Sequence, residues 1–291
     1  MPLQSDSPTI ALVLGGGGAK GFSHIGVIKV LEENDIIPNL VVGTSIGSLV
    51  GSLYASGYTP AQLEQLALTT SDSELTDFVL SNQGFIEGLK LKSFINTKVG
   101  ERNIEDFPIQ FAAVAAEKNT LQKAVFTTGN SGLAVQASSS VPNIFIAPRI
   151  PEKVGKKYID GGVVSLVPVD SARDLGADII IAVDVMAANP ANLDSNATAI
   201  NPPPSLNSLS RFWAFLENTI AAQPNSNRYS SMRLERDRAD IVITPNVSHI
   251  SSIDTSQRRV LIAAGAHAIT PQINAIKQLI EDRSHSKHAT P

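Results

Sequence analysis

The chain has 291 residues, of which 43% are hydrophobic, and its formal net charge is −4. This length suffices for one large domain or two small ones with a sizeable core. Because the small net charge is negative, it gives no electrostatic attraction to nucleic acid, and we expect no nucleic-acid partner. The absence of cysteine excludes disulfides, thiol catalysis and thiolate metal sites, and it fits a reducing compartment.

No targeting or membrane-spanning pattern stands out. Residues Met1 to Thr9 are polar and contain two prolines, unlike a signal peptide, which needs a basic region followed by an apolar one. The longest apolar runs, such as Ile179 to Val183, are too short to cross a bilayer. We therefore expect a soluble cytoplasmic protein, with peripheral contact to a membrane and the oligomeric state both left open.

The first third of the chain alternates strand and helix patterns. Thr9 to Leu14 is apolar almost throughout and runs into the glycine loop Gly15 to Gly21, after which Phe22 to Asn34 has a helical pattern. A second apolar run, Leu40 to Val42, leads into a glycine-rich turn and a small-residue helix, Ser48 to Ala55. This order predicts an α/β fold, a parallel-sheet α/β/α sandwich with a tight turn at the end of the second strand.

The remaining two thirds continue the alternation. Helices are predicted from Pro60, which follows a capping Thr59, and over 89–99, 131–139, 169–175 and 256–280, and strands over 109–116, 121–126, 157–159, 178–183 and 241–243. Thr270-Pro271 predicts a break in the last helix. Residues 187–207, rich in asparagine and proline, predict a mobile loop within one domain of residues 9–281. Residues 1–8 are expected to be disordered, and residues 282–291 to form a frayed tail.

The turn after the second strand is Gly43-Thr44-Ser45-Ile46-Gly47, a Gly-x-Ser-x-Gly sequence. Between a strand and a helix, this motif forms a nucleophile elbow, which lifts the serine above the sheet edge. The flanking glycines are needed because the helix passes too close for a β-carbon. The motif also arises by chance, and then Ser45 is an ordinary serine in a glycine-rich turn.

The loop Gly16-Gly17-Gly18-Ala19-Lys20-Gly21 permits two interpretations. It matches the Gly-x-Gly-x-x-Gly fingerprint of dinucleotide-binding proteins, but the second strand ends without the acidic residue that would hold a ribose. Alternatively, its bare N–H groups form an oxyanion hole, in which each donor is worth roughly 3–4 kcal/mol. Both loops emerge at the carboxyl edge of a parallel sheet, which favours the oxyanion hole.

A serine nucleophile needs a base. None of the five histidines follows a strand, and only His24 begins near the glycine loop, where we expect at most a supporting role. Asp160 directly follows the predicted strand 157–159 and precedes Gly161-Gly162, which let the backbone turn tightly. Its placement makes Asp160 the best candidate for the base, against the alternative of an aspartate that caps a turn.

These motifs, in this order, resemble the patatin-like phospholipase family. The resemblance covers about residues 9–185 and rests on the glycine loop with its Lys20 and Gly21, the elbow with Gly43 and Gly47, and Asp160-Gly161-Gly162. The stretch Ala137 to Pro142 also looks like the family, and beyond residue 185 the likeness is only general, to compact bacterial members. Where the family often has glycine after Pro142, this chain has Asn143, which tolerates a left-handed conformation.

The resemblance implies a serine lipid acyl hydrolase with a catalytic dyad. Ser45 would be the nucleophile and Asp160 the base, and the oxyanion hole would comprise N–H groups of Gly16, Gly17, Gly18 and Ile46. It implies a lipid or simpler acyl ester as substrate, cleaved through an acyl-enzyme intermediate. No metal or other cofactor is expected, because the family does not need the calcium of secreted phospholipases.

Alternatives remain at this point: a short-chain carboxylesterase, a non-catalytic nucleotide-binding or regulatory α/β protein, and a scaffold with an idle site. A lipid enzyme needs apolar surface near its site. The candidates are Phe85, Ile86, Leu89, Phe94, Ile95, Phe145, Ile146 and Ile150. The stripe 209–220 has helical spacing and predicts either a core-facing helix or a lid.

Overall fold

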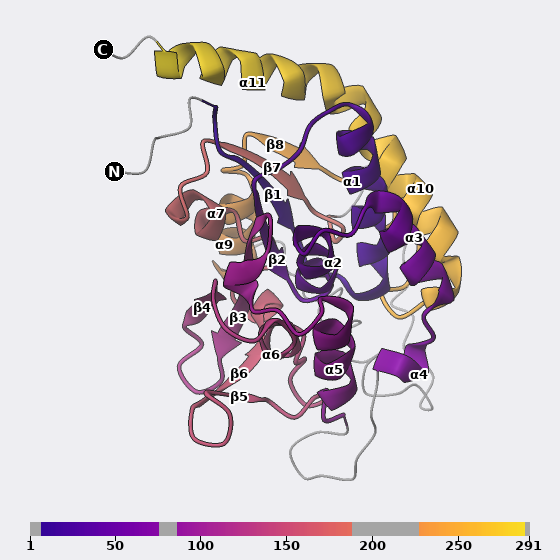
Figure 1. Cartoon of the computed structure of the whole chain (residues 1–291), viewed down its shortest axis with the longest axis vertical. Helices are drawn as coiled ribbons and strands as arrows, with labels where there is room; N and C mark the ends of the chain where they lie inside the picture. Colours follow the sequence, from indigo (N-terminus) through magenta and orange to yellow (C-terminus); the bar gives the residue numbers. More distant parts are fainter. Residues whose placement is uncertain (1–6, 76–85, 188–226, 289–291) are drawn as a thin grey trace.

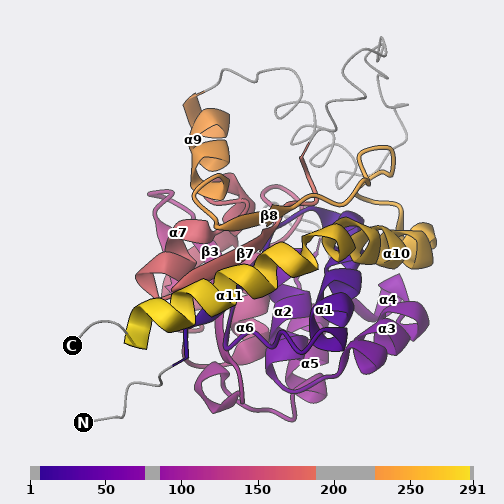
Figure 2. The same cartoon turned by 90° about the horizontal axis from the view of Figure 1, so that it is seen from above.

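The computed structural model describes residues 7–75, 86–187 and 227–288 (Figures 1 and 2). Its strands are β1 (Ile10–Leu14), β2 (Leu40–Thr44), β3 (Gln110–Glu117), β4 (Lys123–Phe126), β5 (Arg149–Ile150), β6 (Lys156–Asp160), β7 (Ile179–Val183) and β8 (Ile241–Ile243). Its helices are α1 (Ser23–Glu33), α2 (Ile46–Ala55), α3 (Pro60–Thr69), α4 (Asp72–Leu75), α5 (Leu89–Lys98), α6 (Ser131–Ser138), α7 (Val169–Asp174), α9 (Asn227–Arg236), α10 (Arg258–Ile269) and α11 (Ile273–His288). The alternation of strands and helices confirms the predicted α/β class.

The sheet has a parallel centre and antiparallel additions. Strands β3, β2, β1, β7 and β8 lie side by side in that order and are all parallel. Strands β4 and β6 pair with β3 in the antiparallel sense, and β5 pairs with β6. Every residue of β1, β2 and β7 is buried, as apolar strands require when helices cover both faces of a parallel sheet.

Helices cover the sheet on two sides. Helices α1, α2 and α6 lie on one face, with α3, α5 and α10 outside them, whereas α7 and α9 lie on the other face (Figures 1 and 2). Helices α1 and α10 cross closely: a β-carbon on Gly26 would lie 1.9 Å from the Ile262 carbonyl oxygen. The main core is an apolar cluster around the central strands, and two small apolar clusters lie apart from it.

The helix ends follow the sequence signals at two places. Thr59 caps α3 through its side chain, with Gln62 completing a capping box and Pro60 at the first helical position. A short 3-10 turn, Thr270–Gln272, separates α10 from α11, so the predicted break is confirmed.

The tail prediction needs a correction. Helix α11 continues to His288, although fraying was predicted from residue 282. Hydroxyl groups of Ser284 and Ser286 donate to carbonyls one turn earlier, and the Gln278 amide donates to Asp282, so polar side chains bond along the helix. The predicted mobile loop, apart from its first residue, and the 209–220 stripe lie outside the described residues, as do residues 1–6.

Candidate active site

Ser45 occupies the expected elbow. It follows β2 directly, forms the N-cap of α2, and has φ 55° and ψ −124°, a left-handed region that L-residues rarely adopt. The turn is tight enough to require glycine, because a β-carbon on Gly47 would lie 2.0 Å from the Leu14 carbonyl oxygen. Ser45 is only 4% exposed. Ser45 therefore lies in the strand–turn–helix arrangement that defines a nucleophile elbow.

Strand pairing brings Asp160 to Ser45. Thr44, the last residue of β2, pairs with Val114, and Asp160, the last residue of β6, pairs with the next residue, Ala115. Strand β4 occupies the other edge of β3 at these positions, so β2 and β6 share one edge and meet end to end. The carboxyl ends of the two strands therefore face each other because β6 runs antiparallel, a direction that the sequence did not reveal.

The Asp160 carboxyl group is enclosed. It is 2% exposed, and its Oδ1 accepts a hydrogen bond of 2.7 Å from the Gly162 amide. Its Oδ2 is buried and has no hydrogen-bond partner among the described residues. Burial raises the pKa of Asp160 to about 6, although the nearby Ser45 hydroxyl and the Gly162 amide act in the opposite direction. A carboxyl group with this pKa exchanges protons readily near neutral pH.

The glycine loop lies against the serine. A β-carbon on Gly16 would be 3.4 Å from the Ser45 β-carbon. The Gly16 amide donates to the Leu166 carbonyl at 3.0 Å, so this predicted oxyanion donor is already engaged in the structure. Within the described parts of the chain, the amides of Gly17, Gly18 and Ile46 have no hydrogen-bond partner. These three N–H groups are thus free to bind an anionic oxygen.

His24 contacts the backbone of the glycine loop through its side chain and is not placed as the base for Ser45. Its Nε2 lies 2.8 Å from the Gly15 carbonyl oxygen, which can only accept, so Nε2 carries the proton. The side chain is fully buried, and burial lowers the pKa of His24 to about 4. A neutral imidazole that donates to the loop backbone fits the supporting role that the sequence left open for it.

Comparison with known proteins identifies the family of the chain. Residues 12–173 match the family model described as patatin-like phospholipase. The chain belongs to the patatin-like phospholipase family. The chain is 33% identical to patatin-like phospholipase domain-containing protein 6 of Mus musculus over 66% of this chain, and 32% identical to lysophospholipase NTE1 of Coccidioides immitis (strain RS) over 86% of it. Each match covers 15% of the relative, so the chain spans about a seventh of the length of these curated proteins.

The patatin-like fold also matches a solved structure. VipD from Legionella pneumophila superimposes with a TM-score of 0.60 and 15% sequence identity, over 93% of this chain and 67% of that one. The family assignment and the structural match confirm the expected resemblance and the expected fold.

Around the patatin-like motifs, the structure adds residues that the sequence did not single out. The Ser138 hydroxyl accepts a hydrogen bond of 2.9 Å from the Ser45 amide and donates one of 2.6 Å to the Val114 carbonyl. The Thr44 hydroxyl donates to the Ser165 carbonyl at 3.0 Å. Ser138 lies in the serine-rich stretch that resembles the family, so a signal existed for it. At the end of that stretch Asn143 has φ 64°, the left-handed conformation that asparagine tolerates better than most residues.

A buried carboxylate from α9 reaches the same region. Both Glu235 carboxylate oxygens accept from the Ser165 hydroxyl at 2.9 Å, and Glu235 lies 3.4 Å from the Lys123 ammonium group. The neighbouring Leu166 carbonyl accepts from the Gly16 amide, so Glu235 is connected to the glycine loop through two residues. Helix α9 follows the matched family region and has no strong apolar pattern, and sequence analysis missed it.

The other predicted motif residues take structural positions. Lys20 is buried within the glycine loop, and a β-carbon on Gly21 would meet the Ile46 side chain at 2.4 Å. Gly161 and Gly162 form the short 3-10 turn after Asp160. Among the residues that the structure describes, no three histidine or acidic side chains come together as a metal site would need. The same residues contain no helix that is long and apolar enough to span a membrane.

Proposed function

We propose that this chain is a serine lipid acyl hydrolase that uses Ser45 and Asp160 as a dyad. The observation that carries the proposal is the end-to-end meeting of β2 and β6, which sets a strained elbow serine beside a buried carboxyl group with a pKa of about 6. A weak hydroxyl nucleophile needs an adjacent base, and Asp160 is the titratable group that this pairing supplies. Family membership supports the choice of an acyl ester as substrate.

In the first step, the Ser45 hydroxyl oxygen forms a bond to the ester carbonyl carbon while its proton passes to Asp160 Oδ2. The carbonyl electron pair moves onto oxygen, and the N–H groups of Gly17, Gly18 and Ile46 would hold that negative charge. The tetrahedral species then collapses, and the alcohol leaves with the proton from Asp160. The product is an acyl group on Ser45 and an ionised Asp160.

In the second step, Asp160 accepts a proton from water as the water oxygen attacks the acyl carbonyl. Collapse of the second tetrahedral species breaks the bond to Ser45, whose oxygen takes the proton back from Asp160. The fatty acid is released and both residues return to their starting states. The buried position of Asp160 suits both directions of proton transfer, because its pKa lies near the working pH.

The test compares hydrolysis of a medium-chain ester and a fluorescent phospholipid by wild type, Ser45→Ala and Asp160→Asn, with a calcium chelator present throughout. We expect wild type to cleave both substrates and each variant to lose about 10³-fold or more in kcat. Cleavage of the simple ester alone would favour a short-chain carboxylesterase, the second candidate. Retained activity in Ser45→Ala would contradict the dyad.

A further inference from the structure

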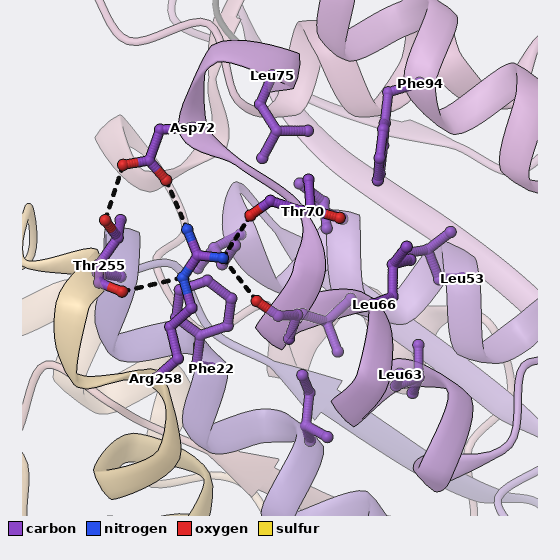
Figure 3. A pocket seen from close by; sticks show the side chains of 16 residues that line it. Phe22, Leu53, Leu63, Leu66, Thr70, Asp72, Leu75, Phe94, Thr255 and Arg258 are labelled. Carbon is purple, nitrogen blue, oxygen red and sulfur yellow. Dashed lines mark hydrogen bonds and ion pairs between the residues drawn. The ribbon is translucent and has the colours of Figure 1, made fainter.

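An apolar cavity lies among the helices that flank the glycine loop and the elbow. It has a volume of about 150 Å³, and its lining residues come from the glycine loop and from α1, α2, α3, α4, α5 and α10. Figure 3 shows the side chains that line it. Ala19 of the glycine loop and Ile46, the residue after Ser45, both line it. Leu53 and Phe94 also contribute to its apolar wall. The cavity thus touches both the segment that carries the nucleophile and the segment that carries the candidate oxyanion donors.

The size and lining of the cavity select its ligand. An apolar cavity of roughly this volume has room for an apolar molecule of about benzene's size. Aliphatic and aromatic side chains dominate the lining, and its polar residues gather at one end, where Thr70, Asp72, Thr255 and Arg258 lie (Figure 3). An alkyl chain of roughly six to eight carbons suits such a space.

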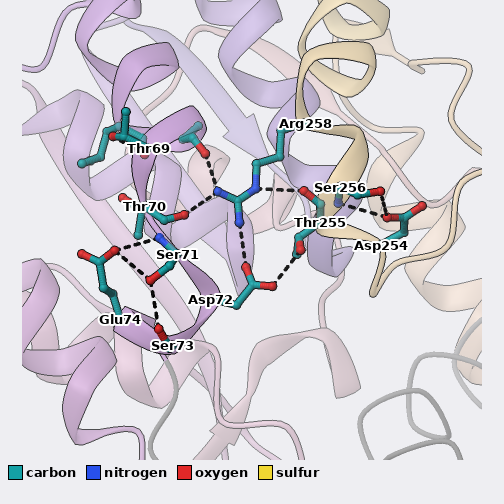
Figure 4. Close-up of polar contacts among 12 residues, drawn as sticks. Thr69, Thr70, Ser71, Asp72, Ser73, Glu74, Asp254, Thr255, Ser256 and Arg258 are labelled. Atoms are coloured by element: carbon teal, nitrogen blue, oxygen red, sulfur yellow. Dashed lines mark hydrogen bonds and ion pairs between the residues drawn. The ribbon is translucent and has the colours of Figure 1, made fainter.

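Arg258 ties that polar end together. Its guanidinium group donates to the carbonyls of Ala67, Thr70 and Thr255 at 2.6, 2.5 and 2.9 Å, and to the Asp72 carboxylate at 2.7 Å (Figure 4). The guanidinium carbon also lies 5.1 Å from the centre of the Phe22 ring. Four of the five N–H groups of Arg258 therefore donate hydrogen bonds within the protein, and we call this set of bonds the Arg258 network. Arg258 is thus poorly placed to bind a phosphate headgroup.

The Arg258 network joins segments that are far apart in the chain. Residues 67–72, at the end of α3 and the start of α4, are held against Thr255 and Arg258 at the start of α10. The Thr255 hydroxyl adds a hydrogen bond of 2.8 Å to Asp72. Because Ala67, Thr70 and Asp72 line the cavity, this network holds that part of the cavity wall against the start of α10.

We propose that this cavity binds the acyl chain of the substrate and that the Arg258 network, which includes Asp72, limits the length of the chain that the cavity accepts. The inference rests on the proposed function, because the chain must belong to the ester that Ser45 attacks. It adds a binding site for the chain and names the residues that set selectivity. Of the apolar residues favoured from the sequence, Phe94 lines this cavity, whereas Ile86 and Phe145 pack in a separate small cluster.

The first experiment measures kcat/KM for p-nitrophenyl esters of acetate, octanoate and palmitate. Each buried methylene contributes about fourfold, so wild type should prefer octanoate strongly over acetate and gain nothing further from palmitate. Ala67→Phe fills the cavity and should lower the octanoate-to-acetate ratio at least tenfold. Ala61→Phe makes the same change at an exposed position of α3 outside the lining and should leave the ratio unchanged.

The same assay tests the effect of the Arg258 network on chain-length preference. Arg258→Met keeps an apolar stem but removes the four hydrogen bonds, and it should shift the preference from octanoate toward palmitate by severalfold. Arg259→Met, at the exposed neighbouring position, is the matched control and should retain the wild-type profile. An unchanged chain-length profile in Ala67→Phe and Arg258→Met proteins that still cleave acetate ester would overturn the inference.

A binding measurement separates this inference from the proposed function. Ser45→Ala protein is titrated with sodium octanoate by calorimetry, and Ala67→Phe in that background should weaken binding more than tenfold. If wild type cleaves no ester but octanoate binds with this dependence, the catalytic proposal fails and the cavity assignment stands. Octanoate binding that is absent or insensitive to Ala67→Phe overturns the cavity assignment, whatever the esterase activity.

Discussion

The Ser138 hydroxyl accepts a hydrogen bond from the backbone amide of Ser45 at 2.9 Å. The same hydroxyl donates to the carbonyl of Val114, the residue that pairs with Thr44 at the end of β2. One buried side chain therefore links the strained elbow to the adjacent strand. Backbone strain persists only where the surroundings enforce it, and this pair of hydrogen bonds is one such restraint.

Ser138→Ala should lower activity more than it lowers stability. It leaves the Ser45 amide and the Val114 carbonyl without their partner, at a cost of about 1–3 kcal/mol in the free energy of unfolding. A small displacement of Ser45 should reduce kcat by about tenfold to a hundredfold. Ser52→Ala is the matched control, because Ser52 is equally buried but its hydroxyl donates to the Leu49 carbonyl within α2. Equal losses of kcat in the two variants would contradict the restraint on Ser45.

Activity should depend on the ionisation of Asp160. Its pKa is about 6, and only the ionised carboxylate can accept the serine proton. We expect kcat/KM to fall about tenfold per pH unit below pH 6 and to level off above about pH 7. His24 has a pKa of about 4 and stays neutral across this range, so it adds no step. A pH–rate profile with its midpoint near pH 4 would place the proton acceptor in a solvated carboxylate instead.

The same carboxyl group should cost the protein stability at neutral pH. Its pKa in the folded protein is raised above 3.8, so ionised Asp160 destabilises the fold at pH 7 by up to about 3 kcal/mol. This cost disappears as the pH falls from about 6 to 4. Asp160→Asn should therefore raise the free energy of urea unfolding at pH 7 while it abolishes activity. A variant that is less stable than wild type at pH 7 would contradict a buried, uncompensated charge.

His24 acts with the opposite sign over an overlapping pH range. Its pKa is lowered from 6.5 to about 4, so the unfolded chain binds a proton that the folded protein rejects, and stability falls as the pH drops from 6.5 to 4. In wild type, Asp160 offsets part of this loss. We expect Asp160→Asn to lose stability more steeply than wild type between pH 6.5 and pH 4, measured by urea unfolding at each pH. Parallel curves for the two proteins would rule out the offset.

Glu235 should matter to the site from outside the matched family region. Glu235→Gln removes the charge that holds the Ser165 hydroxyl and leaves Lys123 without its carboxylate, which should cost about 1–3 kcal/mol in the free energy of unfolding. Loosening the Ser165–Leu166 segment should also lower kcat severalfold through the Gly16 contact. Asp170→Asn is the control: it breaks an exposed ion pair between Asp170 of α7 and Arg238, just after α9. It should change the free energy of unfolding and kcat little. A kcat equal to wild type in Glu235→Gln would show that this contact is structural only.

Local signals were enough to predict the motif-bearing parts of the chain. The elbow at Ser45, the Thr59 cap and the left-handed Asn143 each depend on a few neighbouring residues, so the sequence predicts them well. The apolar strands of the parallel centre are equally legible, because burial on both faces leaves no polar positions. Asp160 was found from its glycines and its place after a strand.

Contacts between distant residues could not be predicted in the same way. The antiparallel direction of β6 is set by pairing with β3, about forty residues earlier, and no local pattern encodes it. The same holds for Glu235 with Ser165 and for Arg258 with Ala67, whose residues lie 70 and 191 positions apart. Helix α9 was missed because ion pairs of Glu235 and Arg236 anchor it. A helix held by a continuous apolar stripe would have been visible in the sequence.

The most direct test of the catalytic account is covalent labelling with a fluorophosphonate, which traps an activated serine as a stable adduct. Mass spectrometry of the digested protein should find the adduct on the peptide that contains Ser45, with labelling abolished in Ser45→Ala and strongly slowed in Asp160→Asn. An adduct on a different serine, or undiminished labelling of Ser45→Ala, would contradict Ser45 as the nucleophile.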